Sequence, residues 1–223
     1  MTFCVLRKDV VKMNKSNIVI TINRQVGSGG RYLGYKLAQK LNFLYLNHEI
    51  VKDAAKDLGT YAENLEASDE KQTSPWISLV SSYAFGSLEF DQDVQIISDR
   101  QAHKAESNII TKVASEKSAV IIGRGGSYIL RNHPRHISIF FNADLEFRKK
   151  RIQKEHNISE NEALQYIQKT DKERVKYFKS LTGQDMYNAC GYNLTIDTGK
   201  IGIEKSLDLI MEYIKKRFGN QVI

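Results

Sequence analysis

The sequence predicts an α/β fold with a parallel sheet of about five strands and helices on both faces. Three observations lead to this prediction. Short apolar runs rich in β-branched residues alternate with stretches of helical periodicity, and the alternation repeats about five times. A glycine cluster directly follows the first apolar run. The predicted strands are residues 17–23, 43–46, 118–123, 136–143 and 192–197.

A glycine-rich loop joins the first predicted strand to the first predicted helix. The run NIVITIN at 17–23 has the composition of a buried strand, and the glycine cluster occupies 27–30. Residues 31–41 carry leucines at helical spacing, and FLYL at 43–46 predicts the second strand. The stretch that follows predicts a helix ending at Gly59, because glycine is the usual residue just beyond a helix.

The middle of the chain is less regular. Residues 60–75 are polar and loop-like, and residues 76–100 show no clear period. A helical pattern returns in QAHKAESNIITKVASEK, where it ends near Glu116. This part of the chain therefore predicts little beyond one helix.

Helix signals are clearer in the carboxyl-terminal half. Asp144 opens a basic helix after the strand at 136–143. Ser159 and Glu162 form a capping box, which predicts a long helix running to about Leu181. The last strand leads into a final amphipathic helix that Gly219 closes.

Composition and charge narrow the functional class. The chain has 223 residues, 41% hydrophobic and 26% charged, with a formal net charge of +7, so an anionic partner is favoured. Its apolar runs reach only about six residues, whereas a membrane span needs roughly 20. Two distant cysteines exclude a disulfide scaffold, and the amino terminus has no secretory signal pattern. We therefore expect a cytoplasmic protein with no membrane association.

The glycine loop predicts an anion site. Where a strand runs through a glycine loop into a helix, free backbone N–H groups and the helix dipole point at the same place. The P-loop pattern is G-x-x-x-x-G-K-[ST]. If Gly29 takes the last loop glycine, the lysine position holds Gly30, the hydroxyl position holds Arg31 and the first glycine position holds Arg24. An ordinary βα turn is the alternative interpretation of this segment.

Several segments in series resemble one enzyme family. INRQVGSGGRYLGYKLAQKL, VIIGRGGSYIL, HISIFFNADLEFRKKRI, TDKERVKYFK and YNLTIDTGKIGIE occur in this order. The series resembles the cytidylate kinase-like branch of the P-loop nucleoside monophosphate kinases over roughly 17–217. It implies a P-loop NTPase-type sheet in a single kinase-like domain at 17–223, after a loose leader at 1–16. It also implies a helical acceptor-binding insertion at about 48–105 and a lid at about 155–190.

The resemblance implies that the glycine loop holds the phosphates of ATP. Because Gly30 carries no charge, Arg31 or Arg24 would replace the missing lysine. No hydroxyl remains at the usual magnesium position, so Mg²⁺ would be held mostly by phosphate oxygens and water, and no protein metal site is predicted. The candidate ATP-binding residues are Arg24, Gly27, Ser28, Gly29, Gly30 and Arg31.

Further candidate residues would bind the acceptor or form part of the lid. The family arginine that binds the acceptor phosphate maps to Arg124, but Ile122 and Gly125 replace the acids that flank it in the family. Residues 171–174 match the D-x-x-R pattern of the family's lid, whose arginines clamp the transferring phosphoryl group. The candidate catalytic residues are Arg174, Arg148, Arg151 and Asp171, and the candidate acceptor-binding residues are Arg124, Asn47, His48 and Glu49.

The predicted function is transfer of the γ-phosphoryl group of ATP to CMP, dCMP or a related small acceptor, so the predicted partners are nucleotides. One alternative is a nucleotide-binding regulator without transfer activity, which the missing P-loop lysine favours. Another is a kinase for a different small molecule. A nucleic-acid-binding module is weaker, because the positive charge is not interleaved with aromatic residues. The oligomeric state is left open.

Overall fold

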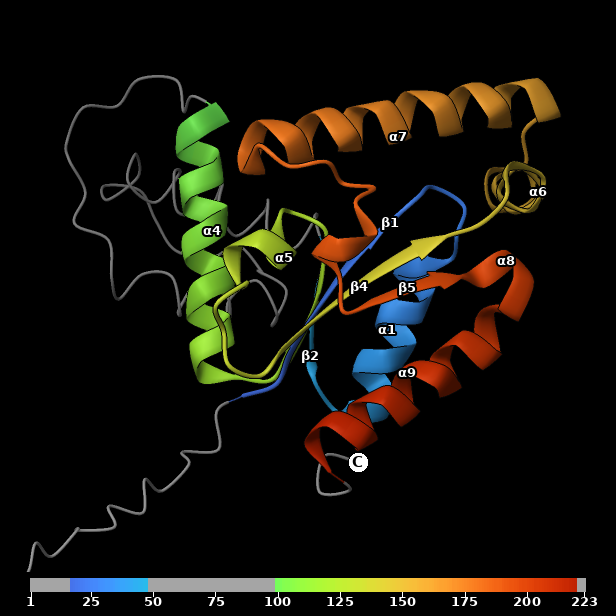
Figure 1. Ribbon diagram of the computed structural model, residues 1–223. Coiled ribbons are helices and arrows are strands. Elements are labelled where there is room, and N and C mark those ends of the chain that lie inside the picture. The colour runs from blue at the N-terminus through green and yellow to red at the C-terminus, as the bar shows by residue number, and fades with distance from the viewer. Residues whose placement is uncertain (1–16, 48–98, 220–223) are drawn as a thin grey trace, which may run out of the picture.

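The computed structural model describes residues 17–47 and 99–219 of the chain (Figure 1). Its centre is a five-stranded sheet in the order β2-β3-β1-β4-β5, in which every neighbouring pair is parallel. The strands are β1 (Val19–Arg24), β2 (Leu44–Leu46), β3 (Ala119–Ile122), β4 (His136–Asn142) and β5 (Leu194–Asp197). The predicted parallel α/β sheet is therefore confirmed.

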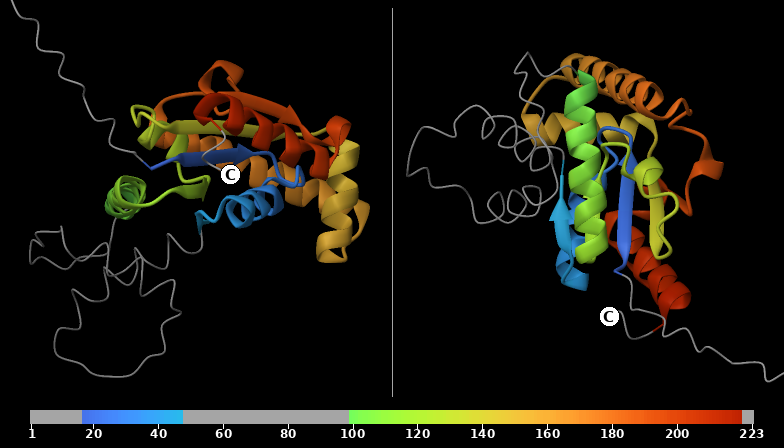
Figure 2. Two further views of the ribbon diagram at one scale, coloured as in Figure 1. Left: turned by 90° about the horizontal axis from the view of Figure 1, so that it is seen from below. Right: turned by 90° about the vertical axis from the view of Figure 1, so that its left-hand side faces the viewer.

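Helices cover both faces of the sheet (Figure 2). One face packs its even-numbered β1 residues, such as Ile20 and Ile22, against α1 and α9. The opposite face packs Val19 and Ile121 against α4 and α5. The helices are α1 (Gly30–Leu41), α4 (Asp99–Glu116), α5 (Gly126–Ile129), α6 (Leu145–His156), α7 (Glu160–Thr182), α8 (Thr198–Ile201) and α9 (Ile203–Phe218).

The carboxyl ends of the strands lie at one edge of the sheet, where open parallel sheets usually bind their ligands. β1 ends at Arg24, β3 leads into Gly123 and β4 ends at Asn142, so three loops meet there. The long helix α7 runs across this edge (Figure 1). Its amino-terminal half packs Ala163 and Ile167 against a loop residue, Val26.

Local sequence signals explain where α7 begins and ends. Ser159 accepts from the backbone of Glu162, and the Glu162 side chain accepts from the Ser159 backbone, so both bonds of the predicted capping box are present. The helix ends at Thr182, one residue beyond the predicted end, with Gly183 in the left-handed region (φ 71°). The short helices α5 and α8 and a 3₁₀ turn at Ala189–Gly191 were not predicted.

Some predicted parts lie outside the described residues. These are the leader at 1–16, most of the acceptor-binding insertion at 48–105, and the site candidates His48 and Glu49. Within 17–47 and 99–219, no helix combines the length and apolar character that crossing a membrane requires.

Candidate active site

The loop between β1 and α1 has a backbone conformation suited to binding an anion. Gly27 and Gly29 have φ of 78° and 79°, a conformation that glycine adopts without strain. A Cβ on Gly27 would lie 2.8 Å from the Arg148 carbonyl oxygen, so the loop also needs glycine for space. Within residues 17–47 and 99–219, no side-chain hydrogen bond caps the start of α1, and the Ser28 hydroxyl donates back to the Gln25 carbonyl oxygen at 2.8 Å. The first amides of α1 are therefore left for a ligand.

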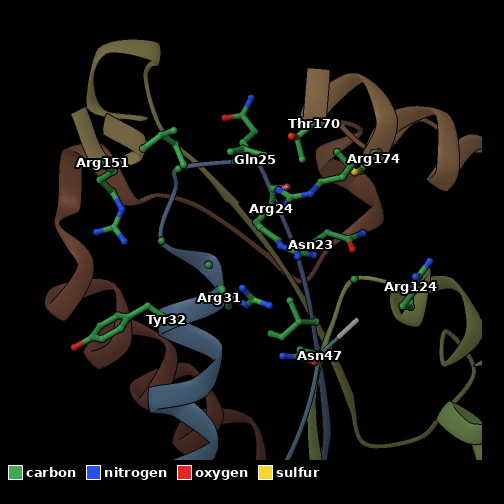
Figure 3. A pocket seen from close by; sticks show the side chains of 18 of the residues that line it. Asn23, Arg24, Gln25, Arg31, Tyr32, Asn47, Arg124, Arg151, Thr170 and Arg174 are labelled. Atoms are coloured by element: carbon green, nitrogen blue, oxygen red, sulfur yellow. Dashed lines mark hydrogen bonds between the residues drawn. The ribbon is translucent and has the colours of Figure 1, made fainter. Parts of the chain in front are cut away.

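The loop opens onto a cavity of about 860 Å³ (Figure 3). This volume is near the upper end of the range for small-molecule sites. Glu155 is the only acidic residue among the described residues that line the cavity. Five arginines line it from five different elements of the fold, namely Arg24, Arg31, Arg124, Arg151 and Arg174.

Arg24 lines the cavity, and its side chain occupies space that a side chain at Gly30 or Gly123 would otherwise fill. A Cβ on Gly30 would lie 2.9 Å from the Arg24 Cβ, and a Cβ on Gly123 would lie 2.6 Å from its Nη1. Burial, together with the positive charge of Arg174, lowers the pKa of Arg24 to about 9, so the guanidinium remains charged at neutral pH. Within the described part of the chain, no carboxylate pairs with it. A bound anion would offset the buried charges of Arg24 and Arg174.

The tight fit at Gly30 predicts a measurable loss of stability on substitution. Gly30→Ala places a methyl group 2.9 Å from the Arg24 Cβ, which is fixed to the backbone, and 3.1 Å from the ring of Phe141, which is fully buried. We expect the free energy of unfolding to fall by about 1–3 kcal/mol, which is the usual effect of overpacking. Thermal unfolding measures this change. Gly191→Ala is the matched control, because a Cβ at Gly191 meets nothing within 4 Å, and an equal loss in both variants would contradict the argument.

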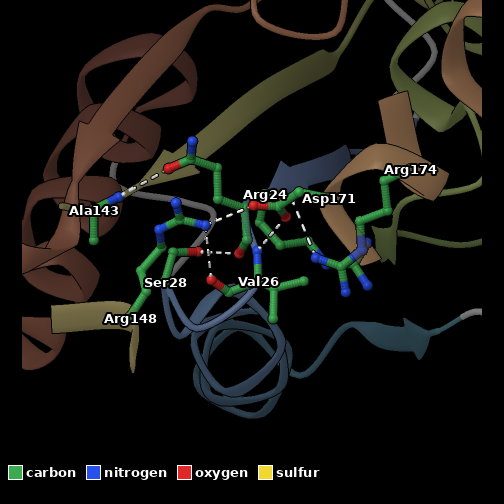
Figure 4. A network of polar contacts seen from close by, with 8 residues as sticks. Arg24, Val26, Ser28, Ala143, Arg148, Asp171 and Arg174 are labelled. Carbon is green, nitrogen blue, oxygen red and sulfur yellow. Dashed lines mark hydrogen bonds and ion pairs between the residues drawn. The ribbon is translucent and has the colours of Figure 1, made fainter. Parts of the chain in front are cut away.

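Two candidate catalytic residues, Asp171 and Arg148, pair with each other beneath the loop (Figure 4). The Asp171 carboxylate accepts from the Val26 backbone N–H at 2.8 Å and from Arg148 Nη1 at 2.6 Å. Arg148 also donates to the Val26 carbonyl oxygen at 3.3 Å. Both side chains are buried, with 12% and 10% of their surface exposed, and neither lines the cavity. In this arrangement the pair fixes the backbone of the glycine loop.

Removing one charge from this pair is expected to destabilise the protein. Asp171→Asn leaves the Arg148 guanidinium buried without its counter-charge, and breaking a buried pair in this way costs about 3–5 kcal/mol. For a domain of this size we expect the melting temperature to fall by roughly 6–20 °C. Asp208→Asn is the control, because Asp208 is 73% exposed and its ion pair with Lys40 lies on the surface. A melting temperature of Asp171→Asn equal to that of the control would show that the pair does not stabilise the fold.

Arg174 lies one helical turn beyond Asp171 and points into the cavity (Figure 3). Its Nη1 donates to the Arg24 carbonyl oxygen at 3.4 Å. Burial lowers the pKa of Arg174, and the nearby Asp171 carboxylate opposes that shift. Arg174 therefore presents its positive charge directly beside Arg24 at the end of β1.

The remaining candidates are spread around the loop. Arg151 lies on the opposite side of the loop from Arg124 (Figure 3), and its Cζ is 3.7 Å from the position of a Cβ on Gly29. Arg31 lies in the first turn of α1, and Asn47 follows β2; both line the cavity. The structure thus gathers the candidate arginines except Arg148 around one cavity, together with Asn47.

Sequence reasoning missed three polar residues near the cavity. Asn23, at the end of β1, donates to the Tyr192 hydroxyl at 2.9 Å, and that hydroxyl in turn donates to the Met186 carbonyl oxygen. Tyr177 lines the cavity, and Glu106 lies behind Arg124. The only signal for Glu106 was a carboxylate on the apolar face of the helix that carries Ile110 and Val113.

The chain is similar to several known proteins. The model of the cytidylate kinase-like family matches residues 19–200. A cytidylate kinase from Saccharolobus islandicus is 24% identical over 198 residues, which is 88% of this chain and 90% of the relative. One from Pyrococcus abyssi is 27% identical over 189 residues, covering 84% and 88%. A crystal structure of an uncharacterized protein from Eubacterium ventriosum superposes with a TM-score of 0.69 at 26% identity, covering 90% of this chain and all of that one.

Proposed function

The chain belongs to the cytidylate kinase-like family, and on this premise we propose that it transfers the γ-phosphoryl group of ATP to a small phosphorylated acceptor, with CMP and dCMP as the first candidates. One observation carries the proposal most strongly. Arginines from five elements line a single cavity at the glycine loop, with a single acidic residue among the described lining residues. Phosphoryl transfer relies on positioning and on positive charge around the transferring group, and this cavity supplies both.

The arginines divide by position into three roles. The loop amides, Arg24 and Arg151 would bind the ATP phosphates, because they surround the start of α1. Arg124 would bind the acceptor phosphate, with Asn47 beside it at the end of β2. Arg174 would hold the transferring phosphoryl group between them. His48 and Glu49 remain predictions for the acceptor side.

We assign Arg24, rather than Arg31, as the substitute for the P-loop lysine. Its side chain occupies the space beside Gly30, where the lysine would begin. Guanidinium remains charged at neutral pH and can bind two phosphate oxygens at once. Arg31 follows Gly30 in the first turn of α1 and reaches the same cavity, so it can add charge without replacing this contact.

We propose that magnesium enters the site with the bound nucleotide. Within the described residues, no three potential ligands of the acidic, histidine or cysteine type cluster together. When bound with ATP, the ion would neutralise charge on the phosphates. The residues of this chain then bind and orient the phosphates through the loop amides and the arginine side chains. ATP is abundant in the cytoplasm, which is where we propose that the protein acts.

A coupled assay of ATP consumption against a panel of nucleoside monophosphates and small alcohols tests the proposal. Turnover with CMP or dCMP above the other acceptors is the expected result. Preference for another compound would make the protein a kinase for a different small molecule. ATP binding by calorimetry without turnover on any acceptor would favour a regulator, the alternative that the missing P-loop lysine suggests.

A further inference from the structure

Arg124 is held by a small polar cluster that the proposed reaction does not by itself require. We call it the Arg124 cluster; it comprises Arg124, Glu106, Tyr177 and His103. Arg124 Nη2 lies 3.5 Å from Glu106 Oε1. The Tyr177 hydroxyl donates to Glu106 Oε2 at 3.2 Å and lies 3.3 Å from His103 Nδ1. The Arg124 guanidinium also stacks 5.0 Å above the Tyr177 ring.

The backbone at Arg124 is unusual for a residue with a side chain. Arg124 has φ of 53° and lies between Gly123 and Gly125, which have φ of 75° and 65°. Three successive left-handed residues make a tight turn, and the arginine in the middle is strained. Such strain persists only where surrounding contacts maintain it, and here they also direct the guanidinium toward the cavity.

Glu106 is placed to orient this guanidinium and not to touch a ligand. Only 6% of its side chain is exposed, and it does not line the cavity. Each of its carboxylate oxygens has a partner, Arg124 on one side and Tyr177 on the other. Burial raises the pKa of Tyr177 to about 12, so its hydroxyl keeps its proton and can donate to the carboxylate.

Tyr177 also connects this cluster to the helix above the cavity. Asp171, Arg174 and Tyr177 follow one another at intervals of three residues on α7, so they share one face. Asp171 contacts the glycine loop, Arg174 points into the cavity and Tyr177 contacts the Arg124 cluster. One helix face therefore reaches the loop, the cavity and the turn that carries Arg124.

We propose that Glu106 and Tyr177 are positioning residues that fix the Arg124 guanidinium for the anionic group of the acceptor, and that Tyr177 links this arginine to α7. The inference rests on the proposed function, because it assigns Arg124 to the acceptor. It goes beyond that function by naming two residues that act through Arg124, and it predicts that their loss affects the acceptor and not ATP.

The test compares Glu106→Gln and Tyr177→Phe with two controls, Glu212→Gln and Tyr213→Phe, which lie on α9 away from the cavity. We expect the KM for CMP to rise about tenfold in both test variants, because a charge-assisted contact is lost. The KM for ATP should change little in both variants. The melting temperature of Glu106→Gln should fall, because the Arg124–Glu106 pair is as buried as the Arg148–Asp171 pair, so the KM values are measured well below the unfolding transition of each variant. Equal rises in both KM values, or a change explained by lost stability alone, would overturn the proposal.

A double-mutant cycle separates positioning from a general structural effect. In an Arg124→Ala background, Glu106→Gln should have less than about a twofold further effect on the acceptor, since its target is gone. An undiminished tenfold effect in that background would contradict the inference.

Calorimetric titrations with CMP and with ATP make the same comparison without turnover. A wild-type protein that binds CMP but transfers no phosphate would refute the kinase proposal, while a CMP-specific loss of binding in Glu106→Gln would still support positioning. If wild type binds CMP and inorganic phosphate no better than Arg124→Ala does, Arg124 receives no anion and the inference is wrong.

Discussion

Arg24→Ala is expected to weaken ATP binding by roughly 10- to 150-fold, because one hydrogen-bonded charge contact with a phosphate contributes about 1.5–3 kcal/mol. The side chain lies at the loop, and no carboxylate among the described residues neutralises it. Burial and the repulsion from Arg174 lower the pKa of Arg24, so removing this side chain also removes an unfavourable buried charge from the free protein. Calorimetric titration with ATP measures the change in Kd, and thermal unfolding reports the stability.

Two further variants sharpen this prediction. Arg24→Lys should recover part of the affinity, because it keeps the charge but loses the second donor group of the guanidinium. Arg31→Ala should have a smaller effect than Arg24→Ala, since the Arg24 side chain fills the space between Gly30 and Gly123. If Arg24→Ala binds ATP like the parent protein and Arg31→Ala does not, the assignment of the lysine substitute is reversed. Unchanged binding in both would remove it altogether.

Arg174→Ala is expected to lower kcat by about 10²–10³ while KM for either substrate changes by less than about threefold. An interaction made mainly with the transferring group stabilises the transition state more than the bound substrates, so its loss appears in kcat. The magnitude matches the loss of one preorganised donor from a site that stabilises developing charge. Steady-state kinetics with saturating ATP and varied acceptor measure it.

The matched control is Lys176→Ala, an exposed cation on the same helix. It should leave both parameters unchanged. A rise in KM alone for Arg174→Ala would make Arg174 a residue for substrate binding, and no change would return it to an ordinary surface charge on α7. Because Arg174 also donates to the Arg24 carbonyl oxygen, the melting temperature of the variant must be compared with that of the parent.

The order of strands and helices could be predicted because each strong pattern is local. β1, β3 and β4 are rich in buried apolar residues, many of them β-branched, and Ser159 with Glu162 marks the start of α7 without any tertiary contact. The sheet order could not be predicted in the same way, since it depends on which apolar faces meet in space. Helices as short as α5 and α8 cannot show a helical period, because each has only four residues.

The residues of the site could be predicted from the sequence, but the contacts between them could not. The glycine loop and its arginines are visible in the sequence, yet nothing there decides between Arg24 and Arg31. That decision depends on the space beside Gly30 and Gly123, which lie about a hundred residues apart in sequence. Asp171 likewise looked like a member of a catalytic pair with Arg174, whereas its contacts are with Val26 and Arg148.

The close approach of Arg24 to Gly30 makes the two positions epistatic. A lysine at 30 places its Cβ 2.9 Å from the Arg24 Cβ, an atom that every residue except glycine retains at 24. A lysine installed at 30 alone therefore carries the same steric cost as Gly30→Ala, about 1–3 kcal/mol, and only glycine at 24 removes the contact with the Arg24 Cβ. Either single change produces a variant with a steric clash or a variant without the cation. Exchange of the arginine for the lysine by single substitutions thus passes through a variant that is either less stable or lacks the cation.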